Sequence, residues 1–241
     1  SIERALREIQ AELGWEPVPG HTLFTGTYYD RKKVGSLIVP VTNKEGEKAV
    51  LKLQLNSVKF DEGSIIRHVT EQNRSTRIVL PALLADRPWD SAHGYGYVVF
   101  EDLITTPKLW KNDRPDEEDL KRHEDFLIEF TQRLSPLSSW MPAPTVSFSH
   151  IAGDAYQHFS QIAAASTHRH LSETDLEPFR TAYLAQLADT DLGAPHFTHG
   201  HLSGHDILYR AETDTFVLLA NLYWSYRPEY YEVVFPLWVD L

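Results

Sequence analysis

The sequence predicts an α+β protein of two lobes, in which an antiparallel sheet is followed by a mainly helical part. Short runs of β-branched and aromatic residues fill about the first 100 positions and end near Glu101. Beyond Glu101, the long segments have the 3.6-residue apolar spacing of helices. These observations divide the chain into residues 1–101 and 102–241, with a cleft expected between the lobes.

The elements of the first part follow from apolar spacing and turn residues. Apolar positions from Ile2 to Leu13 recur at helical spacing and stop at Gly14, which predicts an amphipathic helix. A meander of three consecutive antiparallel strands is expected next, with a turn around Gly46; the strands are Thr22–Asp30, Gly35–Val41 and Lys48–Leu55. A helix and two strands complete this part, the strands separated by a turn rich in Pro, Asp, Ser and Gly: Asp61–Asn73, Ile78–Leu84 and Tyr95–Glu101.

The second part is expected to be mainly helical. Asp116 is placed to cap a long helix over Glu117–Leu134, whose apolar side carries Leu120, Phe126, Leu127, Phe130 and Leu134. A loop rich in Pro and Ser is expected over 136–144, and further helices over 154–165 and 175–187. Residues 196–221 are expected to form loops and short strands. The aromatic end, 224–241, is interpreted as core.

Composition excludes several classes of partner. The net charge is −11, which opposes nucleic-acid binding, and the two basic clusters, 31–33 and 108–114, are short enough to be solvated surface. The acidic balance is compatible with a cationic small molecule. The chain has no cysteine and therefore no disulfide or thiolate metal site. No apolar run approaches the ~20 residues of a membrane helix, so no membrane partner and a cytoplasmic location are expected. Ser1 is interpreted as not being a native start.

Four of the twelve histidines lie between His196 and His205, and this cluster has two interpretations. His199 and His201 would lie on the same side of an extended segment, and neutral imidazoles suit zinc. However, no His-Glu-x-x-His helix is present, and Ser203 and Gly204 stand where a metallo-β-lactamase pattern requires Asp and His. Loop histidines, some of them buried and hydrogen-bonded, are therefore favoured over a zinc site.

The segment from His199 to Leu208 reads His-Gly-His-Leu-Ser-Gly-His-Asp-Ile-Leu. It resembles the catalytic loop His-Gly-Asp-Leu-x-x-x-Asn-Ile-Leu of the aminoglycoside phosphotransferase and choline-kinase-like family, whose fold is protein-kinase-like. The resemblance implies that His201 stands at the catalytic acid, two residues after His199, and that Asp206 stands at the metal-binding Asn. The strand after it closes on Asn221 where the family has a metal-binding Asp, so the amide and carboxylate look exchanged.

Two upstream segments extend the resemblance. Ala-Val-Leu-Lys ending at Lys52 is similar to the strand whose lysine holds the nucleotide phosphates. The family pairs this lysine with a helix glutamate, and both Glu62 and Glu71 are candidates. Val-Val-Phe-Glu-Asp-Leu, which contains Glu101 and Leu103, is similar to the hinge whose backbone contacts adenine.

The departures from the family leave three functional hypotheses open. In an active kinase, His201 would accept the proton of the acceptor hydroxyl, and Asp206 and Asn221 would bind magnesium. In a catalytically silent module, the altered acids and the hairpin at 25–29, which holds one glycine and two tyrosines, would make ATP and magnesium binding weak or absent. An unrelated two-lobe domain is the third. The silent module is favoured, with a hydroxyl-bearing small molecule as ligand.

The length of the chain adds one expectation to this resemblance. The chain stops soon after the strand that closes on Asn221, where family members continue with helices that help build the acceptor pocket. The sequence is therefore interpreted either as truncated or as lacking that part. The oligomeric state is left open.

Overall fold

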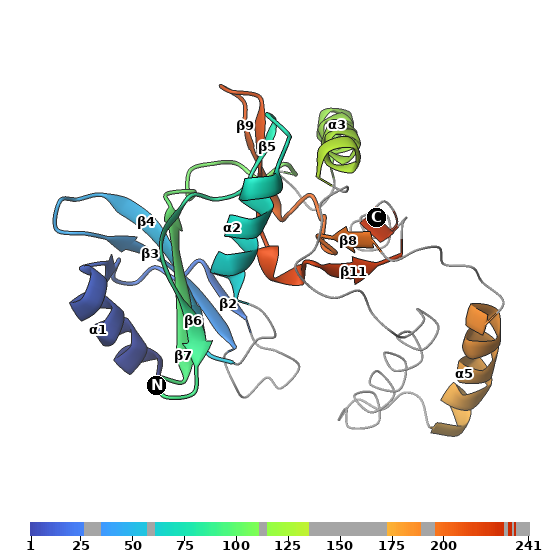
Figure 1. The fold of residues 1–241 in the computed structure, drawn as a ribbon, viewed down its shortest axis with the longest axis horizontal. Helices are drawn as coiled ribbons and strands as arrows, with labels where there is room; N and C mark the ends of the chain where they lie inside the picture. Colours follow the sequence, from blue (N-terminus) through green and yellow to red (C-terminus); the bar gives the residue numbers. More distant parts are fainter. Residues whose placement is uncertain are drawn as a thin grey trace.

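The computed structural model describes residues 1–26, 35–56, 61–110, 115–134, 173–188, 196–228, 231, 232 and 234. Within these residues the protein has an antiparallel sheet with one helix on each side, followed by further helices and short strands (Figure 1). The α+β class predicted from the sequence is confirmed. The division that the sequence places at residue 101 falls at the end of strand β7 and stays a prediction.

The first helix, α1 (Ile2–Leu13), begins and ends where the sequence predicts. Ser1 accepts a hydrogen bond from the Arg4 backbone N–H as its N-cap, and Gly14 closes the helix in the left-handed region at φ 75°. Ala5 and Ile9 are buried against the sheet. The amphipathic face therefore places α1 on the outer side of the sheet.

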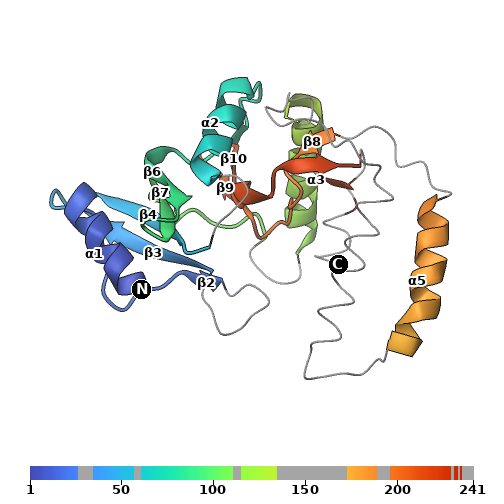
Figure 2. The same ribbon diagram turned by 60° about the horizontal axis from the view of Figure 1, so that its bottom comes forward.

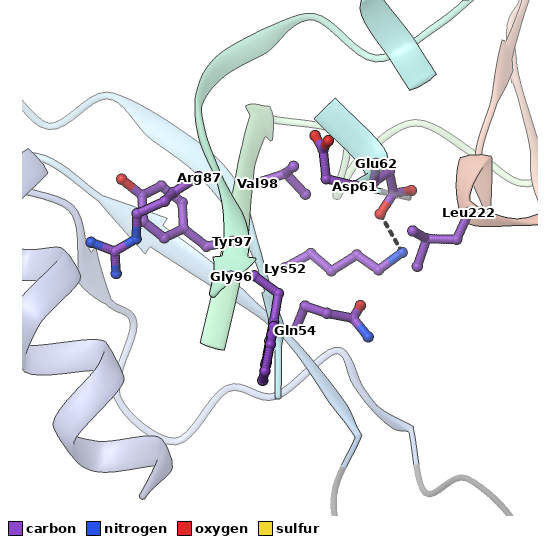
Figure 3. A pocket seen from close by; sticks show the side chains of 10 residues that line it. Lys52, Gln54, Asp61, Glu62, Arg87, Gly96, Tyr97, Val98 and Leu222 are labelled. Carbon is purple, nitrogen blue, oxygen red and sulfur yellow. Dashed lines mark ion pairs between the residues drawn. The ribbon is translucent and has the colours of Figure 1, made fainter. Parts of the chain in front are cut away.

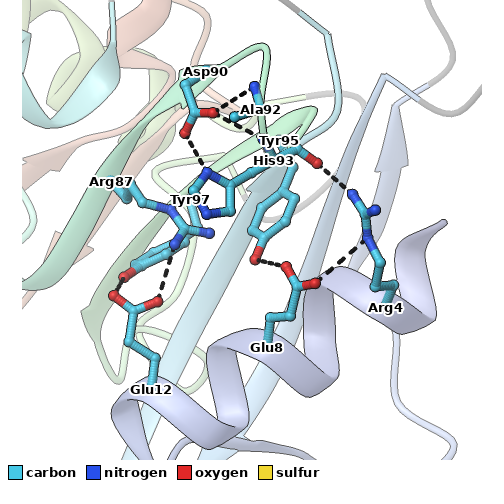
Figure 4. Close-up of polar contacts among 9 residues, drawn as sticks. All are labelled: Arg4, Glu8, Glu12, Arg87, Asp90, Ala92, His93, Tyr95 and Tyr97. Carbon is cyan, nitrogen blue, oxygen red and sulfur yellow. Dashed lines mark hydrogen bonds and ion pairs between the residues drawn. The ribbon is translucent and has the colours of Figure 1, made fainter.

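Polar contacts fix α1 to two strands of that outer face (Figure 4). The Tyr95 hydroxyl donates to Glu8 at 2.6 Å, and the Tyr97 hydroxyl donates to Glu12 at 3.1 Å. Arg87 also donates to Glu12 at 3.1 Å, and its guanidinium lies over both tyrosine rings, 4.7 and 5.0 Å from their centroids. Burial, together with the bond to Glu12, raises the pKa of Tyr97 to about 12.

The main sheet has the strand order β1-β3-β4-β7-β6, with β2 also pairing β3, and all its pairs are antiparallel. Its strands are β1 (Glu16–Pro17), β2 (Phe24–Gly26), β3 (Ser36–Thr42), β4 (Lys48–Gln54), β6 (Leu83–Asp90) and β7 (Tyr95–Glu101). The predicted meander is confirmed as β2-β3-β4. β2 begins two residues later than expected, and residues 27–30 lie outside the described part. Two pairs of β4 and β7 matter for the site, Lys52 opposite Val98 and Gln54 opposite Gly96.

The strand expected at Ile78–Leu84 was predicted wrongly, because the structure divides it. β5 (Ile78–Val79) pairs in parallel with β10 (Thr215–Leu218), whereas β6 pairs with β7. Pro81 lies between them and offers no N–H to continue a ladder. The turn expected after Leu84 is also shorter, since β6 continues through Pro88 as an edge strand with an irregular register. The chain turns over residues 91–94 instead.

Helix α2 (Glu62–Gln72) covers the other face of the sheet and is capped by Asp61, which accepts from the Ser64 N–H at 2.7 Å. Arg67 holds the helix to β6 through two bonds to the Asp86 carboxylate, of 2.6 and 2.9 Å. Gly63 allows this close approach, because a Cβ at that position would lie 2.3 Å from Asp86 Oδ2. The apolar side of α2 is buried and consists of Ile65, Ile66 and Val69.

Helix α3 (Glu117–Arg133) is capped by Asp116, as predicted. Its buried side includes Phe126, Phe130 and Leu134, but Leu120 was assigned wrongly and is 44% exposed. Asp119 and His123 are buried instead. Asp119 pairs with Arg122, and His123 packs edge-on against the Trp110 ring at 5.2 Å.

The remaining elements are α5 (Glu173–Ala188), β8 (His196–Thr198), β9 (Ile207–Arg210), β10, the 3-10 turn η1 (Asn221–Tyr223) and β11 (Ser225–Arg227). β9 and β10 form a hairpin that β5 extends to three strands, and β8 pairs with β11. α3 lies beside β8 and β11, and α5 lies farther out (Figure 2). The helix expected at 175–187 is confirmed, whereas the loop at 136–144 and the helix at 154–165 lie outside the described residues. No helix in the described ranges is long and apolar enough to cross a membrane.

Candidate functional site

Lys52 and Glu62 form an ion pair where β4 meets the first turn of α2. The Lys52 Nζ lies 2.6 Å from Glu62 Oε2, and the two side chains are 14% and 6% exposed (Figure 3). Glu71, the other candidate partner, lies near the far end of α2 and is exposed. Of the two glutamates left open by the sequence, the structure pairs Lys52 with Glu62.

The segment that resembles a hinge joins β7 to the part of the chain beyond it. The Glu101 carboxylate accepts from the Ala82 backbone N–H at 3.1 Å and from Arg210 on β9 at 2.9 Å. Leu103 is buried in a small cluster with Leu208 and Val217. Both residues therefore hold the segment against its neighbours, and the adenine contacts that the resemblance assigns would come from its backbone.

His199 is fully buried and uses both ring nitrogens. Its Nε2 donates to the Leu219 carbonyl at 2.8 Å, and its Nδ1 accepts from the His201 N–H at 3.2 Å, which fixes the tautomer with the proton on Nε2. Burial lowers the pKa of His199 to about 4, against the opposing effect of the Leu219 bond. The neutral His199 imidazole is hydrogen-bonded at both nitrogens and so links two loops. This favours a positioning role for His199 over the catalytic role expected from the sequence.

His201 and Asp206 lie together at the surface of the loop. His201 Nδ1 is 2.6 Å from Asp206 Oδ2, and the side chains are 30% and 29% exposed. The His201 ring also stacks on Tyr223, with 4.4 Å between centroids and 17° between planes. The residue at the family's catalytic acid therefore binds the residue at the family's metal-binding amide.

Asn221 points into the protein. Ala220 has a positive φ of 56°, and this turn leaves Asn221 only 1% exposed. The Asn221 amide donates to the Leu218 carbonyl at 2.9 Å, and its oxygen accepts from the Trp224 indole at 3.2 Å. Both ends of the side chain are thus used within the protein.

These contacts test whether Asp206 and Asn221 suit a magnesium ion. One Asp206 oxygen accepts from His201, and Asn221 offers its oxygen to Trp224 in a buried position. Within the described ranges, no three His, Cys, Asp or Glu side chains come together as a metal site, which applies equally to the zinc alternative. As arranged here, Asp206 keeps one carboxylate oxygen outside the His201 contact, whereas Asn221 would have to give up its bond to Trp224 before it could bind a magnesium ion.

Sequence reasoning missed Glu232. Its Oε1 accepts from the Thr198 hydroxyl and from the Gly200 backbone N–H, so it anchors the start of the loop. Gly200 has a φ of 78°, a conformation that suits glycine. Burial raises the pKa of Glu232, with the two donors acting in the opposite direction. The only signal in the sequence is a carboxylate in an aromatic and apolar stretch, and Glu229 three residues earlier gives the same signal.

Comparison with solved structures identifies the class of fold. A macrolide 2'-phosphotransferase type I superposes with a TM-score of 0.62 at 12% identity, covering 97% of this chain and 77% of that one. A spectinomycin phosphotransferase in complex with ADP and spectinomycin gives 0.58 at 10% identity, covering 97% and 72%. A Plasmodium vivax ethanolamine kinase gives 0.54 at 9% identity, covering 91% and 59%.

The protein therefore has the protein-kinase-like fold that these small-molecule phosphotransferases share. No protein-family model matches the sequence, and no curated protein matches it. At these identities the likeness defines the fold, and the activity has to be argued from the site.

Proposed function

We propose that this chain is a phosphotransferase-fold protein that binds a small-molecule ligand and, weakly, a nucleotide, and whose metal-dependent phosphoryl transfer is impaired or absent. The observation that carries the proposal is the 2.6 Å contact between His201 and Asp206. This contact joins the two altered positions to each other. Phosphoryl transfer instead needs a carboxylate that faces the acceptor and a ligand that faces the metal.

The Lys52–Glu62 pair and the Asp206 and Asn221 positions differ in how far they keep the arrangement that phosphoryl transfer requires. The Lys52–Glu62 pair is formed, which supports a cation placed beside nucleotide phosphates. Asp206 and Asn221 are hydrogen-bonded within the protein, so a metal ion would have to displace those bonds before binding. Because the phosphates would lose that source of charge neutralisation, we infer weak nucleotide binding.

The class of ligand follows from the fold and the charge. The structural neighbours include phosphotransferases named for spectinomycin and macrolides and a kinase named for ethanolamine. For this chain we infer a small molecule with a hydroxyl group, and the net charge of −11 favours a cationic one. No nucleic acid or membrane enters this proposal.

The test compares the parent with a triple variant, His201→Asp/Asp206→Asn/Asn221→Asp, which restores the family's residues. We expect the parent to show little ADP-induced thermal stabilisation that depends on magnesium, and the triple variant to gain magnesium-dependent ATP hydrolysis. Asp206→Asn alone, which lacks the restored carboxylates, is the matched control. Robust magnesium-dependent turnover by the parent, lost in His201→Ala, would overturn the proposal.

The same contact favours a second candidate, an active small-molecule kinase. A hydrogen bond from Nδ1 to Asp206 orients the His201 imidazole, as a general base requires. This candidate predicts acceptor-dependent ATP consumption by the parent that falls in both His201→Gln and Asp206→Asn. Retention of turnover in His201→Gln would exclude it.

A further inference from the structure

A small pocket lies beside the Lys52–Glu62 pair, between the sheet and the start of α2 (Figure 3). Lys52 and Gln54 are two residues apart on β4, so both project from the face that α2 covers, and both side chains run toward Leu222. The pocket encloses about 20 Å³, which is room for one water-sized atom.

Three residues that line this pocket have buried N–H donors without a hydrogen-bond acceptor. One is Arg87, whose guanidinium lies over the tyrosine rings of the outer face, and the others are Gln54 and Trp89. Gln54 is 9% exposed, and its Nε2 has no hydrogen-bond partner among the described residues. The same holds for the Trp89 indole Nε1, which belongs to β6. A buried donor without an acceptor costs its full desolvation, and most buried polar groups in native proteins are paired. The two donors therefore point to an occupant that supplies an acceptor.

The backbone brings Trp89 close to this face of the sheet. A Cβ on Gly96 would lie 2.4 Å from the Trp89 backbone nitrogen and 2.9 Å from the Arg87 carbonyl. Gly96 is the residue opposite Gln54 in the β4–β7 ladder. The glycine thus lets the irregular part of β6 approach Gln54, and Gln54 and Trp89 line the same pocket.

We propose that this pocket is an oxyanion subsite, in which Gln54 and Trp89 donate to one oxygen of a phosphoryl group beside Lys52. Lys52 carries three N–H groups, and the contact with Glu62 is the one ion pair it makes among the described residues. The two carboxylates that line the pocket are engaged, Glu62 with Lys52 and Asp61 with the Ser64 N–H. The donors left over are all N–H groups, and they match an oxygen that carries negative charge.

The proposal rests on the proposed function in one respect, namely that the cleft receives phosphate groups. It adds that part of their stabilisation comes from uncharged donors of the sheet. Because these donors need no metal ion, binding should persist in the presence of a chelator.

The experiment titrates inorganic phosphate into the full chain in EDTA and follows the tryptophan indole N–H signals by NMR. Trp89→Phe assigns the Trp89 signal, which should move on titration because its hydrogen bond changes. Gln54→Leu should weaken phosphate binding at least about tenfold, the typical value of one hydrogen bond to a charged group. Trp15→Phe, which removes a tryptophan packed on the outer face of the sheet, is the matched control and should not change the affinity.

Several outcomes would overturn the proposal. One is a Trp89 signal that stays still at saturating phosphate; another is equal phosphate affinity in the parent and in Gln54→Leu, which would mean that the pocket holds only water. If Gln54→Leu fails to fold, Gln54→Glu keeps the shape and replaces the donor by a carboxylate, and it should abolish binding. Phosphate binding without ADP binding would count against the proposed function alone. An ADP affinity that is unchanged by substitution of Gln54 or Trp89 would count against the subsite alone.

Discussion

His201 Nδ1 donates to Asp206 Oδ2 across 2.6 Å, so the imidazole occupies one oxygen of the carboxylate that the resemblance assigns to the metal. An aspartate at position 201 would instead place two like charges at this separation, which is unfavourable. The two departures from the family are therefore physically compatible with each other, and each explains why the other is tolerated.

The first prediction concerns the loss of the hydrogen bond between His201 and Asp206. In His201→Ala the carboxylate loses its donor, so magnesium should stabilise the variant in the presence of ADP more than it stabilises the parent. At a free magnesium concentration about ten times the dissociation constant, mass action adds about 1.4 kcal/mol, or a Tm rise of roughly 3–6 °C for a chain of this size. Differential scanning fluorimetry with and without magnesium measures this shift.

The matched control for this prediction is His201→Ala/Asp206→Asn, which lacks the released carboxylate and should lose the magnesium-dependent rise. An equal rise in the single and double variants would show that Asp206 does not contact the ion.

The second prediction concerns the Lys52–Glu62 pair, whose two side chains are largely buried. Lys52→Met leaves the Glu62 carboxylate buried without its partner, and the expected loss is about 3–5 kcal/mol of unfolding free energy. Adding Glu62→Gln removes that uncompensated charge and should recover most of the loss. Urea denaturation of the parent, both single variants and the double variant measures the coupling. Additive losses would mean that the pair is not coupled.

The third prediction concerns pH. Burial lowers the folded-state pKa of His199 to about 4, so the unfolded chain binds a proton that the folded chain excludes. The contribution of neutral His199 to the free energy of unfolding is therefore complete above about pH 6.5. It is lost as the pH falls toward 4, by about 3 kcal/mol at most. His199→Gln should flatten the pH dependence of unfolding free energy in this window. His21→Gln, at an exposed position, is the control, and an unchanged slope in His199→Gln would contradict the assignment.

The fourth prediction concerns the close contact between α2 and β6. Gly63→Ala would place a Cβ 2.3 Å from Asp86 Oδ2 and disturb the bonds from Arg67, with an expected loss of about 1–3 kcal/mol. Alanine is the better helix former, so the sign of the change separates the two effects. Thr70→Ala lies on the exposed side of the same helix and should be neutral or stabilising. Thermal unfolding of both variants makes the comparison, and a stabilised Gly63→Ala would show that α2 is not held closely to β6.

The sequence by itself determined the elements whose signals are local. The bounds of α1 follow from its apolar spacing and Gly14, and the β7 strand was placed residue for residue. The ordered motifs also indicated the fold class, because Lys52 and the loop at His199 keep their order along the chain. Local signals failed where the partner was distant. Ile78 and Val79 pair with β10, about 140 positions away, and no pattern around Pro81 contains that information.

Only the tertiary structure decided how the site residues are used. Glu62 and Glu71 are equivalent in the sequence, and the packing of α2 on β4 brings only Glu62 to Lys52. The positive φ of Ala220 turns Asn221 toward Trp224, and the role of Asn221 as a metal ligand stays a prediction. The physical reason is common to both cases. Side-chain direction depends on backbone geometry and on neighbours from other elements, whereas a motif records residue types in order.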